Sequence, residues 1–151
     1  MEIERKYLIH QLPENINRYP HYEIEQGYLN TEPVVRIRRQ GDEYVLTYKS
    51  KGFLSREEYN LPLTKEAYEH MRPKTDGILI SKTRYVLPLG QKLKIELDHF
   101  HKPYETLYLA EVEFPDEESA RKFIPPSWFG KDVTFSAKYQ NSTLSRGQGA
   151  V

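Results

Sequence analysis

Short stretches in which charged and apolar residues alternate follow one another along most of this chain. Successive side chains of a β-strand point to opposite faces, so this alternation indicates strands with one charged and one apolar face. Gly41-Asp42, Lys51-Gly52 and Leu89-Gly90 supply turns between such stretches. The pattern predicts strands over residues 1–9, 22–30, 33–40, 43–50, 54–62, 79–87, 91–99 and 107–115.

Two segments break the alternation and predict helices, over residues 64–71 and 116–123. Thr64 and Asp116 stand where a side chain can cap the first backbone N–H groups of a helix. Eight strands with mostly short connections predict a mainly β (α+β) fold, an eight-stranded antiparallel β-barrel with a few flanking helices. We expect a single domain over residues 1–144 and a disordered tail over 145–151.

The composition narrows the class of protein. The 151 residues carry 22 Lys and Arg and 22 Asp and Glu, so the formal net charge is zero. That balance argues against a non-specific nucleic-acid binder, which would carry a strong basic excess. Cysteine is absent, which excludes disulfides and thiolate metal sites. The charged first residues lack the pattern of a secretory signal and no apolar run is long enough to span a membrane, so we expect a cytoplasmic protein.

The first strand places charges where a half-buried strand would place apolar residues. Glu2, Glu4 and Lys6 share one face, while Ile3 and Arg5 take the other. The same arrangement recurs in six further strands, as Arg36 with Arg38, Thr47 with Lys49, Arg56 with Glu58 and Asn60, Lys82 with Arg84, Lys94 with Glu96 and Asp98, and Glu111 with Glu113. These charges either line the interior of a barrel or form the solvated face of an open sheet, and the alternation fits both.

An interior lined by these residues would have a specific chemistry. Buried charges must be paired or bind ions, because desolvating an isolated charge costs too much. Arginine and lysine suit phosphate oxygens, whereas clustered carboxylates suit hard cations such as Mg²⁺ or Mn²⁺. One cavity with both kinds of group would fit a complex of a metal with a polyphosphate. A zinc hydrolase is a poor match, since the chain has neither cysteine nor an HExxH motif.

The order of these motifs resembles the CYTH superfamily, also called the triphosphate tunnel metalloenzymes. The resemblance begins with Glu2-x-Glu4-x-Lys6 and extends over nearly the whole chain. It continues through Gln26-Gly27-Tyr28-Leu29, Arg36-Ile37-Arg38, Leu46-Thr47-Tyr48-Lys49, Arg56-Glu57-Glu58-Tyr59, Lys82-Thr83-Arg84-Tyr85, Glu96-Leu97-Asp98 and Glu111-Val112-Glu113-Phe114. The compact first strand and the late segment 123–130 look most like the small bacterial inorganic triphosphatases.

The resemblance implies a role for each charged position. Metal-binding carboxylates would be Glu2, Glu4, Glu111 and Glu113, with Glu58, Glu96 and Asp98 as further candidates. Phosphate-binding residues would be Lys6, Arg36, Arg38, Lys49, Arg56, Lys82, Arg84 and, near the C-terminus, Lys138. Lys6 with Tyr28 is the candidate pair for assisting the attacking water. Asn60 and Ser136-Ala137 depart from the family pattern, where relatives often carry acids; this puts a second metal site and the Lys138 contact in doubt.

The expected activity is Mg²⁺- or Mn²⁺-dependent hydrolysis of a small-molecule triphosphate, inorganic triphosphate first. Alternatives are a thiamine or nucleoside triphosphatase, a class IV-type adenylyl cyclase and a non-catalytic polyphosphate-binding module. The cyclase needs a base pocket beyond the tunnel, which the sequence does not plainly supply. The module would have no use for an acidic cluster. We expect no nucleic-acid or membrane partner, and exposed aromatic residues at an open barrel suggest a homodimer.

Overall fold

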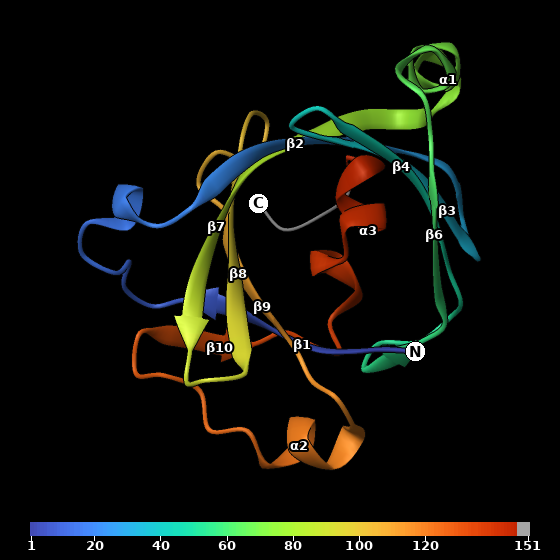
Figure 1. Ribbon diagram of the computed structural model, residues 1–151. Coiled ribbons are helices and arrows are strands. Elements are labelled where there is room, and N and C mark those ends of the chain that lie inside the picture. Colours follow the sequence, from blue (N-terminus) through green and yellow to red (C-terminus); the bar gives the residue numbers. More distant parts are fainter. Residues whose placement is uncertain (148–151) are drawn as a thin grey trace.

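A computed structural model describes residues 1–147 of the chain, and its main feature is one antiparallel sheet wound into a barrel (Figure 1). The strands are β1 Glu2–Ile9, β2 His21–Thr31, β3 Val34–Gln40, β4 Glu43–Lys49, β5 Ser55–Arg56, β6 Glu58–Pro62, β7 Asp76–Leu89, β8 Leu93–Phe100, β9 Tyr108–Glu113 and β10 Phe129–Asp132. The helices are α1 Lys65–Met71, α2 Glu117–Lys122 and α3 Asn141–Ser145, with short 3₁₀ helices η1 Ile16–Arg18, η2 Arg72–Lys74 and η3 Ala137–Tyr139.

The strand order shows how the sheet closes. Neighbours run β10-β1-β9-β8-β7-β2-β3-β4-β6, and β5 returns to pair with β1. Strands β5 and β6 are two halves of one predicted strand, interrupted at Glu57. Counted as one, they complete a ring of eight strands, so the predicted barrel is confirmed. Strand β10, which pairs with the second half of β1, is an addition that the alternation did not predict.

The two faces of the barrel wall separate charge from apolar surface. Ile3 and Tyr7 of β1 point outward and pack with Leu97 of β8, beneath Ala120 of α2 and Phe129 of β10. The alternate residues therefore point inward, so the interior arrangement holds for the charged positions and the solvated-face alternative is wrong. The outer face of β6, by contrast, is not covered by a helix within residues 1–147. The outward-facing side chains of Tyr59 and Leu61 on this strand are exposed.

Both predicted helices begin at the predicted caps. The Thr64 hydroxyl accepts a hydrogen bond from the backbone N–H of Ala67, and the Asp116 carboxylate accepts one from Ser119. None of the helices in residues 1–147 has the length and apolar character needed to cross a bilayer.

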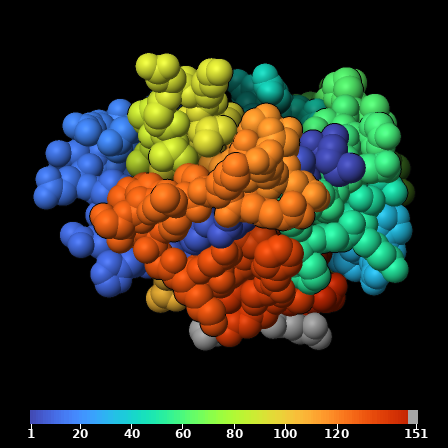
Figure 2. Space-filling model, turned by 90° about the horizontal axis from the view of Figure 1, so that it is seen from below, coloured from blue at the N-terminus to red at the C-terminus, as the bar shows by residue number. Residues whose placement is uncertain are grey.

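The C-terminal segment runs back into the barrel, where α3 lies inside the ring of strands (Figure 1). Leu144 is fully buried against Ile80 and Phe100, so the base of the barrel interior is apolar. Gly77, at φ 66°, leaves room for the backbone at Ser145, which a Cβ atom would meet. From below, the orange and red C-terminal segments form much of the surface (Figure 2). Ser145 thus belongs to a helix rather than to the predicted tail, of which residues 148–151 lie outside the described part.

Candidate active site

The barrel encloses a polar cavity of about 370 Å³. The predicted site residues on its wall are Glu2, Glu4, Lys6, Tyr28, Arg36, Arg38, Lys49, Arg56, Glu58, Arg84, Glu96, Glu111 and Glu113. They come from strands spread around the ring, because each strand contributes the inward-facing half of its alternation. Cations and carboxylates thus share one interior, as the lumen interpretation required.

Three predicted site residues lie elsewhere. Lys82 and Asp98 are 0% exposed and do not line the cavity. Each lies two residues away from a cavity residue of the same strand, Arg84 on β7 and Glu96 on β8. Lys138 is exposed on η3, where its ammonium lies 5.3 Å from the Tyr139 ring centroid. The structure therefore does not bring Lys138 to the cavity; the C-terminal residues on its wall are Gln140, Asn141 and Ser142.

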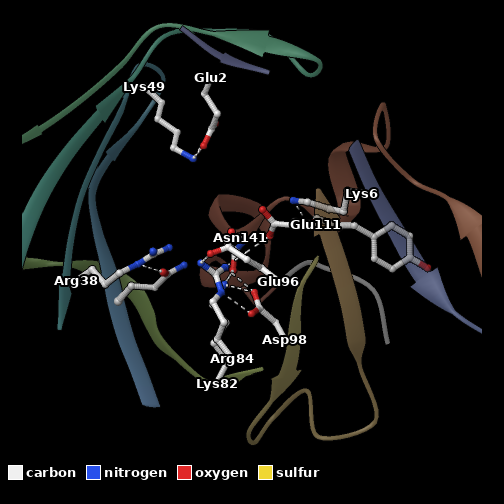
Figure 3. A network of polar contacts seen from close by, with 12 residues as sticks. Glu2, Lys6, Arg38, Lys49, Lys82, Arg84, Glu96, Asp98, Glu111 and Asn141 are labelled. Carbon is white, nitrogen blue, oxygen red and sulfur yellow. Dashed lines mark hydrogen bonds and ion pairs between the residues drawn. The ribbon is translucent and has the colours of Figure 1, made fainter. Parts of the chain in front are cut away.

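Asp98 is the centre of a buried ion-pair network (Figure 3). Its carboxylate accepts two hydrogen bonds from the Arg84 guanidinium, at 2.7 and 2.9 Å, and lies 2.7 Å from Lys82 Nζ. Although burial raises the pKa of Asp98, the charges of Arg84 and Lys82 hold it below its ordinary value. Both carboxylate oxygens are engaged, so Asp98 acts here as the counter-ion of two cations, not as a group turned toward the cavity.

Lys82 bridges this network to the C-terminal segment. Its Nζ lies 3.3 Å from Asn141 Oδ1, so the ammonium touches one charged and one neutral acceptor. Burial lowers the pKa of Lys82 to about 7, with Asp98 opposing that shift. On Arg84, by contrast, the attraction of Asp98 and Glu96 outweighs burial and raises the pKa. Asn141 carried no signal in the sequence, because it lies outside every alternating stretch.

One side of the cavity has an excess of positive charge. Burial, followed by repulsion from Arg36 and Arg84, lowers the pKa of Arg38 to about 9. Arg38 donates to Gln26 Oε1 at 2.9 Å, a neutral acceptor. Arg36 Nε is buried and has no hydrogen-bond partner among residues 1–147. Buried donors without acceptors are rare and costly, so this side of the cavity is built to receive an anion.

The facing side has an excess of carboxylates. Burial and repulsion from Glu111 and Glu2 raise the pKa of Glu4 well above its ordinary value. Burial, followed by repulsion from Glu2, Glu58 and Glu96, raises the pKa of Glu113 as well. Carboxylates that repel one another in this way are stabilised by a cation between them.

Other carboxylates are already paired with lysine. Lys49 Nζ lies 3.0 Å from Glu2 (Figure 3). It also lies 3.6 Å from Glu58. Burial opposes the ionisation of Glu111, but Lys6 and Arg84 keep its pKa well below the ordinary range. Lys6 Nζ also donates to the Tyr139 carbonyl at 3.4 Å. Lys6 and Lys49 therefore neutralise part of the negative charge of the cavity.

The donor chemistry of the acidic side fits a hard divalent cation. Every candidate ligand is a carboxylate oxygen, the ligand type that Mg²⁺ and Mn²⁺ prefer. As they stand, no three acidic or histidine side chains within residues 1–147 are grouped closely enough to hold a metal ion. Glu4 and Glu111 are close enough to act on each other's pKa, so this pair could contribute ligands to such a cation. The Asn60 amide oxygen accepts a hydrogen bond from the Thr47 hydroxyl at 2.6 Å.

Comparison with known proteins agrees with this architecture. The sequence profile of the CYTH domain matches residues 1–124. The chain belongs to the CYTH domain family. The segment outside that match contains β10 and α3, the elements that pack against β1 and inside the barrel.

Individual relatives are similar to this chain over most of its length. The inorganic triphosphatase of Nitrosomonas europaea is 41% identical over 148 residues, covering 95% of this chain and 96% of the relative. The inorganic triphosphatase of Acetivibrio thermocellus is 36% identical over 124 residues, covering 79% and 77%. The crystal structure of the inorganic triphosphatase NE1496 superposes with a TM-score of 0.72 at 37% identity, over 99% of this chain and 97% of the other. A putative adenylate cyclase from Bacillus halodurans shares the fold at a TM-score of 0.57 and 19% identity, over 80% and 84%.

Proposed function

We propose that this CYTH protein hydrolyses inorganic triphosphate, and that it requires Mg²⁺ or Mn²⁺ to do so. The observation that carries this proposal is the division of one cavity into two sides. On one side Arg36 and Arg38 form no ion pair within residues 1–147, and on the other the carboxylates of Glu4 and Glu113 are repelled by their acidic neighbours. A triphosphate carries several negative charges along a short chain, and a metal complex of it would complement both sides. The two relatives named inorganic triphosphatase, each aligned over most of its length, support the same substrate.

The cations of the cavity hold and orient the substrate in this proposal. Arg36, Arg38 and Arg84 would bind phosphate oxygens, and Arg36 Nε gains the acceptor that it lacks. Lys49, on the strand next to β3, and Arg56 of β5 would bind the chain as well, released in part from Glu2. Fixed cations that already face the phosphates need no reorganisation as charge shifts in the transition state.

The acidic side would hold the metal, with Glu2, Glu4, Glu111 and Glu113 as ligands. When bound, the metal supplies charge neutralisation at the phosphate oxygens. Water would then attack the terminal phosphorus while the anhydride P–O bond breaks, leaving orthophosphate and pyrophosphate. Lys6 and Tyr28 line the same cavity, and we assign them the proton transfer from the attacking water.

The direct test offers tripolyphosphate, ATP and thiamine triphosphate to the purified protein, each with Mg²⁺, with Mn²⁺ and with a chelator. We expect orthophosphate and pyrophosphate from tripolyphosphate, and no turnover with the chelator. Cyclic AMP with pyrophosphate from ATP would establish a cyclase instead. Binding without turnover of any of the three would establish a polyphosphate-binding module.

The role of Lys6 has its own test. Replacing it by Met keeps the length of the side chain but removes the amine. We expect Lys6→Met to abolish turnover while triphosphate binding, measured by calorimetry, weakens far less. Equal losses in turnover and in binding would make Lys6 a phosphate ligand only.

The homodimer is a further proposal. Tyr59 is 60% exposed and Leu61 58% exposed on the outer face of β6. Light scattering coupled to size exclusion would measure the mass, and Tyr59→Ser with Leu61→Ser should shift a dimer toward the 17.9 kDa monomer. A monomeric wild-type protein would rule the dimer out.

A further inference from the structure

Two arginines on the cavity wall are anchored in the same geometry but by different acceptors. On β7, Arg84 stands directly opposite Asp98 of β8 and donates from Nε to its carboxylate at 2.7 Å (Figure 3). On β3, Arg38 stands directly opposite Gln26 of β2 and donates from Nε to its amide oxygen at 2.9 Å. One arginine therefore meets a carboxylate across its strand pair, and the other meets a neutral amide.

The acceptor decides how much positive charge each arginine has left for a ligand. Asp98 also accepts from Nη2 of Arg84 at 2.9 Å, and although burial lowers the pKa of Arg84, this carboxylate raises it well above its ordinary value. On Arg38, burial, followed by repulsion from Arg36 and Arg84, lowers the pKa to about 9. The one hydrogen bond of the Arg38 guanidinium among residues 1–147 goes through Nε, so its two terminal nitrogens remain for a ligand.

Gln26 is a costly residue for the stability of the fold. It is 0% exposed and does not line the cavity, whereas Arg38 does. Its amide nitrogen is buried without a hydrogen-bond partner among residues 1–147. An apolar side chain of similar size would avoid this unpaired donor, and a glutamate would replace it with an ion pair to Arg38. Stability alone therefore favours other residues here, which indicates that the glutamine serves the arginine.

We propose that Gln26 is a positioning residue for phosphate binding, which orients the Arg38 guanidinium through Nε and leaves its positive charge to the substrate. This proposal rests on the proposed function and adds a residue to its binding site. A carboxylate in place of the amide would compete with phosphate for the guanidinium, as Asp98 does at Arg84. An apolar side chain would leave Nε unpaired and the guanidinium without a fixed direction. Because Gln26 does not line the cavity, its effect should depend entirely on Arg38.

Two substitutions of similar size separate orientation from charge. Gln26→Leu removes the acceptor, whereas Gln26→Glu keeps an acceptor and adds a negative charge. The measured quantity is the affinity for tripolyphosphate, by calorimetry with a chelator present so that no metal-dependent turnover occurs. We expect each variant to bind at least about tenfold more weakly, the order expected for a hydrogen bond to a charged group. Gln26→Glu should nevertheless be no less stable than the wild type in urea, because the new carboxylate pairs with Arg38.

A double-mutant cycle with Arg38→Met shows whether Gln26 acts through Arg38. In the Arg38→Met background, Gln26→Leu should change the affinity by less than about twofold, since the side chain that it orients is gone. Gln91→Leu is the control for the substitution itself, because Gln91 is exposed in the turn between β7 and β8. Circular dichroism checks that each variant is folded, and Gln26→Met replaces Gln26→Leu if the latter does not fold.

Each outcome decides the role of Gln26. An unchanged affinity in Gln26→Leu overturns the positioning role, as does an equal loss with and without the Arg38 guanidinium. An unchanged affinity in Gln26→Glu overturns the need for a neutral acceptor. A wild-type protein that binds tripolyphosphate without cleaving it refutes the proposed hydrolysis, and the comparison of affinities still decides the role of Gln26. A wild-type protein that does not bind tripolyphosphate overturns both.

Discussion

Replacing Asp98 by Asn is the sharpest test of the buried network. The substitution keeps the size of the side chain but leaves Lys82 and Arg84 buried without their shared counter-ion. Removing one partner of a buried ion pair costs about 3–5 kcal/mol. Lys82 can shed its proton near neutral pH, because its pKa is already about 7 with Asp98 present. Arg84 keeps Glu96 at 3.2 Å, so we expect a loss near the lower limit, about 3 kcal/mol.

Urea unfolding followed by the fluorescence of the single tryptophan, Trp128, measures this loss. A loss of this size lowers Tm by roughly 6–12 °C in a domain of about 150 residues. Glu118→Gln is the control, since it removes an exposed pair with Lys122 in which both side chains are 74% exposed. Exposed pairs contribute about 0–1 kcal/mol. A loss below about 1 kcal/mol for Asp98→Asn would refute the reasoning, because the network would then contribute no more than a surface pair.

The same variant separates a counter-ion from a metal ligand. The folded-state pKa of Asp98 is lowered, so its contribution is complete above about pH 4 and is lost as the pH falls through the lower folded value. The destabilisation by Asp98→Asn should therefore shrink in acid. A counter-ion role also predicts that Mg²⁺ affinity changes little. A fall in Mg²⁺ affinity of tenfold or more would return Asp98 to the metal ligands.

Two further predictions concern the acidic side of the cavity and the contact between Gly77 and α3. Because the pKa of Glu4 is raised, the metal-free protein should lose stability as the pH rises from the ordinary pKa of a glutamate to the raised pKa of Glu4. For the same reason, Mg²⁺ binding should release up to about one proton. Calorimetry in two buffers with different ionisation enthalpies measures the number of protons released. This number should be smaller in Glu4→Gln but unchanged in Glu57→Gln. If the wild-type protein releases no proton, the prediction is wrong. Gly77→Ala should lower the free energy of unfolding more than Gly41→Ala. Both glycines have positive φ, which costs an alanine about 1–2 kcal/mol, but only at Gly77 would the added Cβ also meet the backbone of α3. Urea unfolding measures both, and equal losses would mean that α3 does not depend on this contact.

The alternation predicted the barrel well because it depends on a property that each strand carries by itself. In β1, the sequence already assigns Glu2 and Glu4 to one face and Ile3 to the other. Because Ile3 is buried in the cluster that α2 covers, the face with Glu2 and Glu4 points into the barrel. Strand β10 escaped prediction because its four residues, Phe129–Asp132, are too few to show a period and are fixed by pairing with β1.

The same alternation fixes the face of a residue but not its depth along the barrel. Lys82 and Asp98 share the inward face with Arg84 and Glu96, yet they lie lower, where they neutralise each other. Lys138 follows no strand at all, and its direction is set by the turn of η3. The positions of Asn141 and its neighbours depend on where the C-terminal segment enters the barrel, which only tertiary packing decides.

Strand β1 pairs with β9, with β5 and with β10, so its partners come from the middle and from the last third of the chain. Its register joins Glu4 to Glu113 and Tyr7 to Asp132. Pairing over such separations slows folding, because the entropy of closing a long loop is lost before the contacts form. During synthesis, β1 leaves the ribosome before all of its partner strands, and its charged and apolar faces both remain uncovered until β9 has emerged. Closure of the ring therefore waits for β9, and chains truncated before residue 108 should remain open and prone to aggregate.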